Sequence, residues 1–390
     1  MAKRRAHHEG SISRRSDGRY QGCLDLGYVD GKRQRKYYYG DTQASVQRQL
    51  LEARFGQSKG VPVIAGKSPT LKEFGDLWLS TIVKISAKPR THAGYSGNFR
   101  LHIEPALGRI RLNKLESGRV QQLLASLSAG GLSPATINLI LKTLRSMLSN
   151  AVKQNLIALN PASSSFITAP RVVRREVTAL TPEAARKFLD HCQGERFECA
   201  YVLAIVLGMR KGEVVGLRWQ DVDLDARSMR VNQILQRVYV GSEPGHKTAV
   251  LASTPKTASS RRQLMLPEFV VKLLRSHKAH QSAQRLAAGE RWMDKTGLVF
   301  TDKHGHPIEA LSLWLDFKNL LKKAGLPPET RFHDLRHICA SLLLAKNVHP
   351  KLVQKMLGHS SIAMTLDLYS HVMQESQTVV SDTMAQVFGR

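Results

Sequence analysis

The stretch that decides the fold covers residues 331–371 and reads RFHDLRHICASLLLAKNVHPKLVQKMLGHSSIAMTLDLYSH. Apolar residues recur in its first part with the 3.6-residue period of a helix. This periodicity predicts a helix that carries His333 and Arg336 near its start, on neighbouring positions. The apolar positions are Leu335, Ile338, Leu342 and Ala345.

Two more short helices are predicted in the same stretch. Pro350 is suited to the first turn of a helix and Gly358 to its end, so His359 is expected just past a helix C-terminus. One of the two serines after His359 can cap a third helix that ends near Tyr369. Three helices joined by tight turns would bring two imidazoles, a guanidinium and a phenol to one wall.

These four groups together predict phosphoryl transfer. A guanidinium binds a phosphate with two hydrogen bonds, and imidazoles exchange protons near neutral pH. A tyrosine, with a pKa of about 10, needs a base and positive charge nearby to act as a nucleophile. Residue types alone leave packing or surface roles open. A His333–His337 metal pair is disfavoured, because Arg336 would place a fixed cation in the ligand shell and an HExxH carboxylate is missing.

Two stretches upstream of residues 331–371 contain further cationic residues. Residues 204–221 read AIVLGMRKGEVVGLRWQD, and residues 254–262 read TPKTASSRR. With the His-x-x-Arg pair, the Leu-Gly-His turn and the later tyrosine, the chain resembles the tyrosine recombinases of the phage integrase family. The first stretch is similar to the family's first-arginine motif and assigns Arg210 to it. The second is similar to its hairpin lysine motif and assigns Lys256.

The resemblance implies a catalytic set for cutting and rejoining DNA. Arg210 and Arg336 would grip the scissile phosphate and stabilise its transition-state charge, and His359 would donate a hydrogen bond to it. These fixed cations take the part that metal ions play elsewhere, so we expect neither a metal nor another cofactor.

The same resemblance assigns the covalent and proton-transfer steps. Tyr369 would attack in line and form a 3′-phosphotyrosyl link, while Lys256 protonates the departing 5′-oxygen. His333 would accept the phenol proton and later return it. Glu213, one turn past the first arginine, is expected to orient that arginine, although a surface carboxylate would have the same spacing. Asp334 is expected to cap the helix that carries the second arginine.

Composition points to nucleic acid as the partner. The chain has 58 Lys and Arg against 31 Asp and Glu, a net charge of +27, and a pI near 10.2. A membrane partner is disfavoured because the longest apolar run, residues 200–207, is far shorter than the roughly 20 residues of a membrane span. The opening MAKRR lacks the apolar region of a signal peptide. The four cysteines form no CxxC pair, as expected in a reducing cytosol without structural disulfides or zinc.

Residues 9–58 predict a small domain of three strands and a helix over 42–54. Asp-Gly pairs at 17–18 and 30–31 mark hairpin turns. Two-stranded ribbons fit the major groove, so the basic and aromatic hairpin is expected to bind DNA rather than serve only as a charged edge strand. This position also resembles the arm-binding domain of lambda-type integrases. The predicted DNA-binding residues are Arg14, Arg15, Arg19, Lys32, Arg33, Arg35, Lys36 and Tyr38.

The whole chain is predicted to be multidomain, mainly α with small β-sheets. A basic tail (1–8) precedes the N-terminal domain, and a linker (59–69) leads to a helical core-binding domain (70–165) with helices over 71–85, 90–101, 115–127 and 133–154. A second linker (166–175) leads to a mixed α/β tyrosine-recombinase catalytic domain (176–390), with strands near 228–240 and 262–266.

The family resemblance also implies partners and a location. We expect double-stranded attachment sites of core and arm type, a homotetramer on DNA, an accessory DNA-bending protein and an excision factor, in the cytoplasm of a bacterial host at the nucleoid. The element would be a phage or another mobile element that the enzyme integrates and excises. Two alternatives stay open: relaxation of DNA by a type IB topoisomerase-like enzyme, and a non-catalytic DNA-binding regulator on the same fold.

Overall fold

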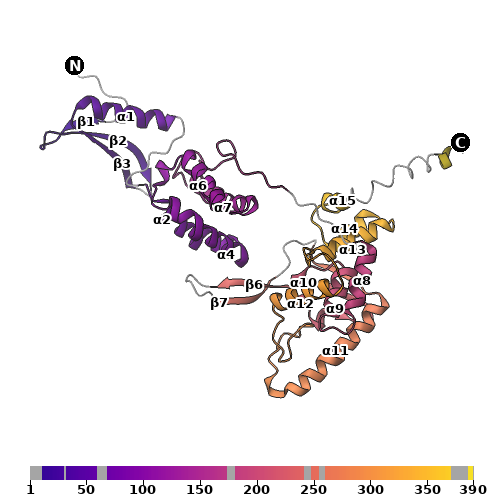
Figure 1. The fold of residues 1–390 in the computed structure, drawn as a ribbon. Coiled ribbons are helices and arrows are strands. Elements are labelled where there is room, and N and C mark those ends of the chain that lie inside the picture. Colours follow the sequence, from indigo (N-terminus) through magenta and orange to yellow (C-terminus); the bar gives the residue numbers. More distant parts are fainter. Residues whose placement is uncertain are drawn as a thin grey trace. The chain divides into compact units, whose positions relative to one another are not determined.

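The computed structural model describes residues 11–29, 32–58, 68–173, 181–240, 247–253, 260–369 and 385–389. The chain forms two compact units, Met1–Arg174 and Arg175–Arg390. In Figure 1 the first unit is coloured from indigo to magenta and the second from magenta through orange to yellow. The architecture is mainly helical with small antiparallel sheets, as the sequence predicts.

The first unit begins with a three-stranded antiparallel sheet in the order β1-β2-β3. The strands are β1 (Ser11–Arg14), β2 (Tyr20–Val29) and β3 (Lys32–Gly40). At the predicted first turn, Gly18 has a φ of 86°, which favours glycine, and the Arg19 N–H donates to the Asp17 carboxylate at 3.1 Å. The second predicted Asp-Gly turn, at 30–31, lies outside the described residues.

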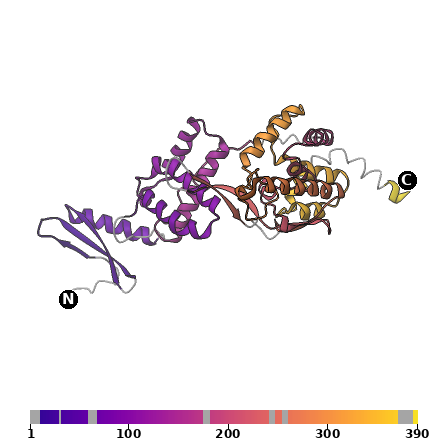
Figure 2. The same ribbon diagram turned by 90° about the horizontal axis from the view of Figure 1, so that it is seen from below.

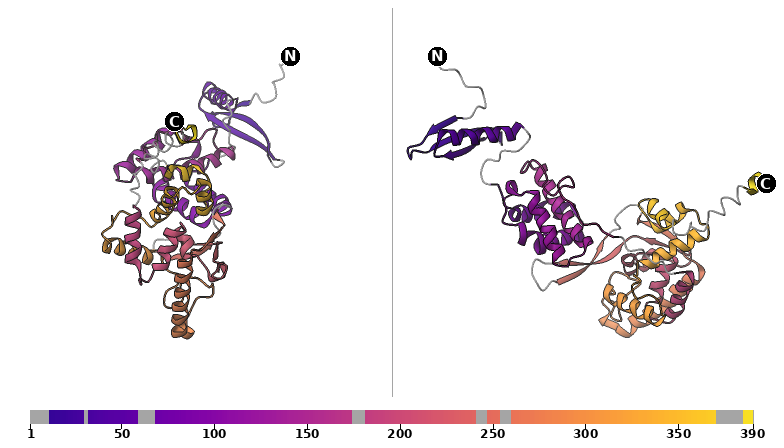
Figure 3. Two further views of the ribbon diagram at one scale, coloured as in Figure 1. Left: turned by 90° about the vertical axis from the view of Figure 1, so that its right-hand side faces the viewer. Right: turned by 45° about the horizontal axis from the view of Figure 1, so that its top comes forward.

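Helix α1 (Gln43–Ser58) lies along one face of this sheet, as Figures 1 and 3 show. The contact is close, because a Cβ atom on Gly22 would lie 2.6 Å from a methyl carbon of Val46. Leu24, Val46 and Leu50 form the buried core between them. The helix is four residues longer at its C-terminal end than the predicted range 42–54.

Residues 68–173 form a bundle of helices, drawn in purple in Figure 2. Ser133 caps α7 with Pro134 in its first turn, as predicted. The predicted helices over 71–85 and 90–101 are each interrupted by a π-helical stretch, which hydrophobic periodicity does not reveal. The elements are α2 (Leu71–Leu77), η1 (Trp78–Val83), α3 (Lys84–Ser86), α4 (Pro89–Asn98), η2 (Phe99–Ile103), α5 (Glu104–Leu107), η3 (Leu112–Lys114), α6 (Ser117–Ala129) and α7 (Pro134–Lys153).

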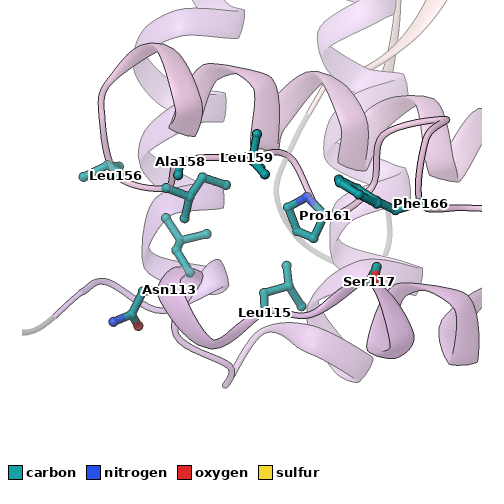
Figure 4. Close-up of a pocket in the computed structure, with 10 residues that line it drawn as sticks. Asn113, Leu115, Ser117, Leu156, Ala158, Leu159, Pro161 and Phe166 are labelled. Atoms are coloured by element: carbon teal, nitrogen blue, oxygen red, sulfur yellow. The ribbon is translucent and has the colours of Figure 1, made fainter. Parts of the chain in front are cut away.

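A cavity of about 270 Å³ lies at one end of this bundle (Figure 4). Leu115, Leu159, Pro161 and Phe166 supply much of its apolar wall, and the polar residues that line it are Asn113 and Ser117. None of its lining residues is ionisable, so this cavity has no group for acid–base chemistry.

The second unit packs its helices around α9 (Glu198–Val206), which is buried on all sides from Cys199 to Ile205. Such a helix belongs to the centre of a domain rather than to its surface. Within the described residues, no helix has both the length and the apolar character that a membrane crossing needs. The other helical elements are α8 (Pro182–Cys192), α10 (Lys211–Val215), η4 (Trp219–Asp221), α11 (Glu268–Ala288), η6 (Gly289–Arg291), α12 (Ala310–Lys323), α13 (Asp334–Ala345), α14 (Pro350–Leu357) and α15 (Ala363–Tyr369).

Two small antiparallel sheets complete this unit. One has the order β4-β5-β8, with strands Val222–Asp223, Ser228–Val231 and Arg262–Met265, and the other pairs β6 (Ile234–Val240) with β7 (Lys247–Ser253). The predicted strand region near 228–240 therefore holds two strands, β5 and β6, which belong to different sheets. The chain leaves the first sheet at Asn232 and Gln233, whose side chains donate to Asp221 and to the Gly216 carbonyl. Strand β7 was not predicted.

Candidate active site

Three segments distant in sequence meet at one place in the second unit: residues 208–210 before α10, the start of α13, and residues 357–359 at the C-terminal end of α14. Gly208 has a φ of 62°, and a Cβ atom there would lie 2.2 Å from a methyl carbon of Leu357. Gly358 ends α14 in the left-handed conformation with a φ of 67°. A Cβ atom at position 208 would clash, and the left-handed φ at position 358 favours glycine, so the two glycines permit the close approach of these segments.

Arg336 fastens the three segments together. Its side chain is 2% exposed, and its guanidinium donates to the backbone carbonyls of Gly208 and Leu357. Burial and then the nearby charge of Arg210 lower the pKa of Arg336 to about 9, which leaves it cationic at neutral pH. Two of its five N–H groups are used in these two bonds, so others can serve an anion.

Arg210 lies beside Arg336 on the more exposed side. Its Nη1 donates to Glu213 Oε1 at 2.8 Å, and its Nη2 donates to the Gly358 carbonyl at 3.2 Å. The side chain is 33% exposed, whereas that of Glu213 is 1% exposed. The two arginines that the sequence assigns to one phosphate therefore share the backbone of the turn at 357–358.

Sequence reasoning missed a third arginine at this place. Arg262, at the start of β8, donates Nη2 to Glu213 Oε2 at 2.9 Å and Nη1 to Oε1 at 3.1 Å. Burial alone would raise the pKa of Glu213, but the bonds and charge of Arg262 and Arg210 outweigh burial and lower it. Glu213 and Arg262 lie in the quoted stretches 204–221 and 254–262, but no local pattern there indicates that the Arg262 side chain turns inward.

The two imidazoles lie in different surroundings. His359 is buried, and its Nδ1 lies 2.9 Å from the hydroxyl of Thr365, a fully buried residue that the sequence did not single out. His333 precedes α13, and its ring meets that of His337 edge-on at 4.9 Å between centroids. Burial, followed by neighbouring imidazole and guanidinium groups, lowers the pKa of His333 to about 4. Burial and the charges of Arg336 and Arg210 lower that of His359 to about 4 as well.

Asp334 differs from its expected place at the helix cap. It is the first residue of α13, and the cap position is occupied by His333. The Asp334 carboxylate accepts the backbone N–H of Arg331 at 2.7 Å and its guanidinium at 2.8 Å. Asp334 therefore holds the chain that enters the helix.

The remaining two predicted catalytic residues are only partly covered by the described structure. Tyr369 is the last residue of α15, a helix that packs against α13 and α14, but its side chain lies outside the described part. Lys256 falls within 254–259, between β7 and β8, also outside the described residues. Across the ranges that the structure describes, no group of three or more His, Cys, Asp or Glu side chains could hold a metal ion.

Comparison with known proteins identifies the family. Residues 178–376, just over half of the chain, match the phage integrase family, and residues 70–128 match the N-terminal SAM-like domain of phage integrases. The chain belongs to the phage integrase family. The protein is therefore a tyrosine site-specific recombinase, an enzyme that breaks and rejoins DNA, and DNA is its partner.

Relatives match nearly the whole length of this integrase-family chain. It is 29% identical to a "Tyrosine recombinase XerC-like" protein of Caldanaerobacter subterraneus subsp. tengcongensis, over 92% of this chain and 93% of that protein. It is 24% identical to the ICEBs1 integrase of Bacillus subtilis, over 96% and 99% of the two chains.

Solved integrase structures share the fold. The Tn1549 transposon integrase in complex with a circular intermediate DNA gives a TM-score of 0.66 at 22% identity, covering 82% of this chain and all of that one. A lambda integrase dimer bound to a core site gives 0.55 at 19% identity, covering 94% and 96%.

The small N-terminal sheet of this integrase-family chain divides its predicted DNA-binding residues between two faces. Tyr38 is half-buried against the core under α1, and burial raises its pKa. Arg33, Arg35, Tyr37 and Tyr39 alternate with it along β3 and are exposed. The burial of Tyr38 argues against direct DNA contact by its ring, whereas Tyr37 and Tyr39 are exposed aromatic residues of β3 on the open face.

Several of the basic residues predicted to bind DNA contact other side chains of the same domain. Arg15 lies over the Tyr39 ring at 5.4 Å, and Lys36 lies 6.0 Å from the Tyr38 ring. Three more contacts are exposed: Arg14 over Tyr20, Arg19 with Asp41, and Arg33 with Asp25. Such pairs are worth little in water and can be exchanged for phosphate contacts. Lys32 begins β3, but its side chain lies outside the described part.

Proposed function

We propose that Tyr369 is the nucleophile of this recombinase and that the residues gathered around the turn at 357–359 complete its catalytic site. The observation that carries the proposal is the convergence of Arg210, Arg336 and His359 beside the helix that ends at Tyr369. Two guanidiniums at one place provide the N–H groups that a phosphate binds with two parallel bonds.

The reaction exchanges one phosphodiester for another, so it needs no energy source. The phenol oxygen of Tyr369 forms a bond to phosphorus while the bond to the 5′-oxygen breaks, which leaves a 3′-phosphotyrosyl link and a 5′-hydroxyl. Lys256 supplies the proton to the leaving oxygen. The reverse attack by a 5′-hydroxyl of the partner strand rejoins the DNA and releases the tyrosine.

His333 is the proposed acceptor of the phenol proton. A pKa of about 4 keeps the imidazole neutral before DNA binds, and only a neutral imidazole can accept a proton. The phosphate adds negative charge to a site dominated by Arg210 and Arg336, which would favour the protonated form during the reaction. His359, fixed by Thr365 through Nδ1, has its other ring nitrogen for the phosphate.

The other parts of the chain have proposed DNA sites of their own. The open face of β3, with Arg35, Tyr37 and Tyr39, would enter a groove of an arm-type site. The helical region 70–165 would hold the core-type site together with the catalytic residues. We further propose that four copies assemble on two duplexes, with an accessory DNA-bending protein and an excision factor, to integrate and excise a mobile element at the nucleoid in the bacterial cytoplasm.

A nicked suicide core site tests the nucleophile. The wild-type protein is expected to form a covalent DNA adduct, and Tyr369→Phe is expected to form none while binding DNA with similar affinity. Arg210→Ala and Arg336→Ala should abolish adduct formation with little loss of binding. Mass spectrometry that locates the nucleotide on another side chain would refute the assignment of Tyr369.

Supplying a second DNA attachment site distinguishes a recombinase from a topoisomerase-like enzyme and from a non-catalytic regulator. A recombinase joins the two sites, a topoisomerase forms the adduct and relaxes supercoils without recombinant product, and a regulator forms no adduct. Deletion of residues 1–58 should spare the adduct at a core site but impair integration. Unchanged integration would contradict the arm-binding role.

A further inference from the structure

The buried carboxylate of Glu213 lies between two guanidinium groups. Arg262 binds it with both Nη atoms, at 2.9 and 3.1 Å, which is the bidentate geometry of strong arginine–carboxylate pairs. Arg210 adds one side-chain bond at 2.8 Å, and the Arg210 backbone N–H adds another at 2.9 Å. Four bonds fill the acceptor positions of the carboxylate, so Glu213 has no remaining capacity to draw Arg210 closer.

The charges in this cluster are unequal in number and in exposure. One anion, Glu213, faces two cations, of which Arg262 is 4% exposed and Arg210 is 33% exposed. The fully buried bidentate pair of Glu213 and Arg262 cancels its own charge in a region of low dielectric. The charge of Arg210 therefore stays available for an anion that approaches from its exposed side.

Arg262 also reaches the turn that carries the rest of the site. Its Nε donates to the carbonyl of Met356, in the last turn of α14. The next two carbonyls, of Leu357 and Gly358, accept from Arg336 and Arg210. One backbone segment thus receives a hydrogen bond from each of the three arginines on successive residues.

We propose that Arg262 is a positioning residue for strand cleavage, which neutralises Glu213 so that Arg210 presents its charge and N–H groups to the scissile phosphate. The Arg262 side chain, which is 4% exposed, is too buried to touch DNA itself. Without it, the buried Glu213 carboxylate would have Arg210 as its remaining partner in this cluster and would hold that guanidinium with both oxygens. The inference rests on the proposed function, because it assigns Arg210 to the phosphate.

The test compares substitutions in the full chain by the single-turnover rate of adduct formation on the suicide site, with DNA affinity and thermal unfolding measured in parallel. Arg262→Gln is expected to slow adduct formation on the order of 100-fold, the scale of losing one transition-state contact, with DNA affinity little changed. Arg262→Lys keeps the charge without the planar fork and should retain part of the rate.

The double variant Glu213→Gln, Arg262→Gln distinguishes neutralisation from a merely structural role. It removes the buried anion along with its partner, so Arg210 is no longer drawn inward, and its rate should exceed that of Arg262→Gln by about tenfold. A role in packing alone predicts a double variant at least as slow as Arg262→Gln. Arg218→Gln is the matched control, because Arg218 forms a similar pair with Asp221 at 2.7 Å. The Arg218→Gln variant is expected to cleave DNA at the wild-type rate.

Two results would overturn the inference: a wild-type rate for Arg262→Gln, or a double variant no faster than that single one. If Arg262→Gln does not fold at the assay temperature, the comparison passes to Arg262→Lys and the double variant. Equal rates for those two and the wild type would then refute the role. Absence of an adduct on Tyr369 in the wild-type protein would instead refute the proposed function.

Discussion

Replacing Gly208 by alanine is expected to destabilise the second unit and to disturb the arginine pair at once. The new Cβ atom would lie 2.2 Å from Leu357 Cδ2 and 3.3 Å from Cys339 Sγ, where ordinary carbon contacts need about 3.5–4 Å. Leu357 and Cys339 are both buried, so neither side chain can turn into solvent. The carbonyl of Leu357, which accepts from Arg336, would have to move with its residue.

The magnitude has two parts. A non-glycine residue in the left-handed region costs about 1–2 kcal/mol, and overfilling a packed interior costs about 1–3 kcal/mol more. The sum, roughly 2–5 kcal/mol, is a large share of the 5–15 kcal/mol typical of a folded domain. For a unit of this size it corresponds to a decrease of roughly 4–20 °C in Tm.

Thermal unfolding followed by calorimetry measures the loss, and Gly194→Ala is the control. Gly194 has a φ of 75° in the same unit, but a Cβ atom there would meet nothing within 4 Å. That variant should lose only the backbone part. Equal losses in the two variants would refute the argument from the Leu357 contact, and full cleavage by folded Gly208→Ala would refute the link to Arg336.

Three further outcomes are expected. Because the pKa of His333 and of His359 is about 4 in the folded chain and near 6.5 in the unfolded chain, the unfolded state binds protons first as the pH falls, so stability should decrease between about pH 6.5 and 4. Urea unfolding at several pH values measures this, and the same slope in a variant with both residues changed to glutamine would contradict it. Tyr37→Ala should weaken arm-site binding, measured by fluorescence anisotropy, with little change in Tm, whereas Tyr38→Ala should lower the Tm measured by calorimetry. The reverse result would contradict the assignment of Tyr37 to the open face and Tyr38 to the buried face of the sheet. Adduct formation should persist in excess EDTA because side chains provide the positive charge, and a loss of adduct that Mg²⁺ restores would contradict this.

Much of the local structure could be predicted because its causes lie within a few residues. Pro350 and Gly358 mark the first helical residue of α14 and the residue just after its end, and Ser133 with Pro134 marks the start of α7. Capping and the φ preferences of glycine and proline act over one helical turn. The motifs containing Arg210, His333 and Arg336 could be found because each is a short pattern with a fixed spacing that resembles a motif of the family.

The sequence could not reveal which side chains meet across the domain. The partnership of Arg262 with Glu213 spans 49 residues, and it depends on the pairing of β8 with β5 and on the packing of α10, which carries Glu213, against β6. The bond between His359 and Thr365 depends on the fold of the short turn before α15. The direction of Tyr38 depends on which sheet face α1 covers.

The sequence by itself determined the kind of chemistry, the order of its motifs and the ends of helices such as α7 and α14. Only the tertiary structure decided that two arginines would share one buried carboxylate, and that three arginines would donate to the backbone carbonyls at 356–358. The physical reason is one of range. Backbone preferences act between neighbours in the chain, whereas the burial and neutralisation of a charge depend on every segment that packs around it.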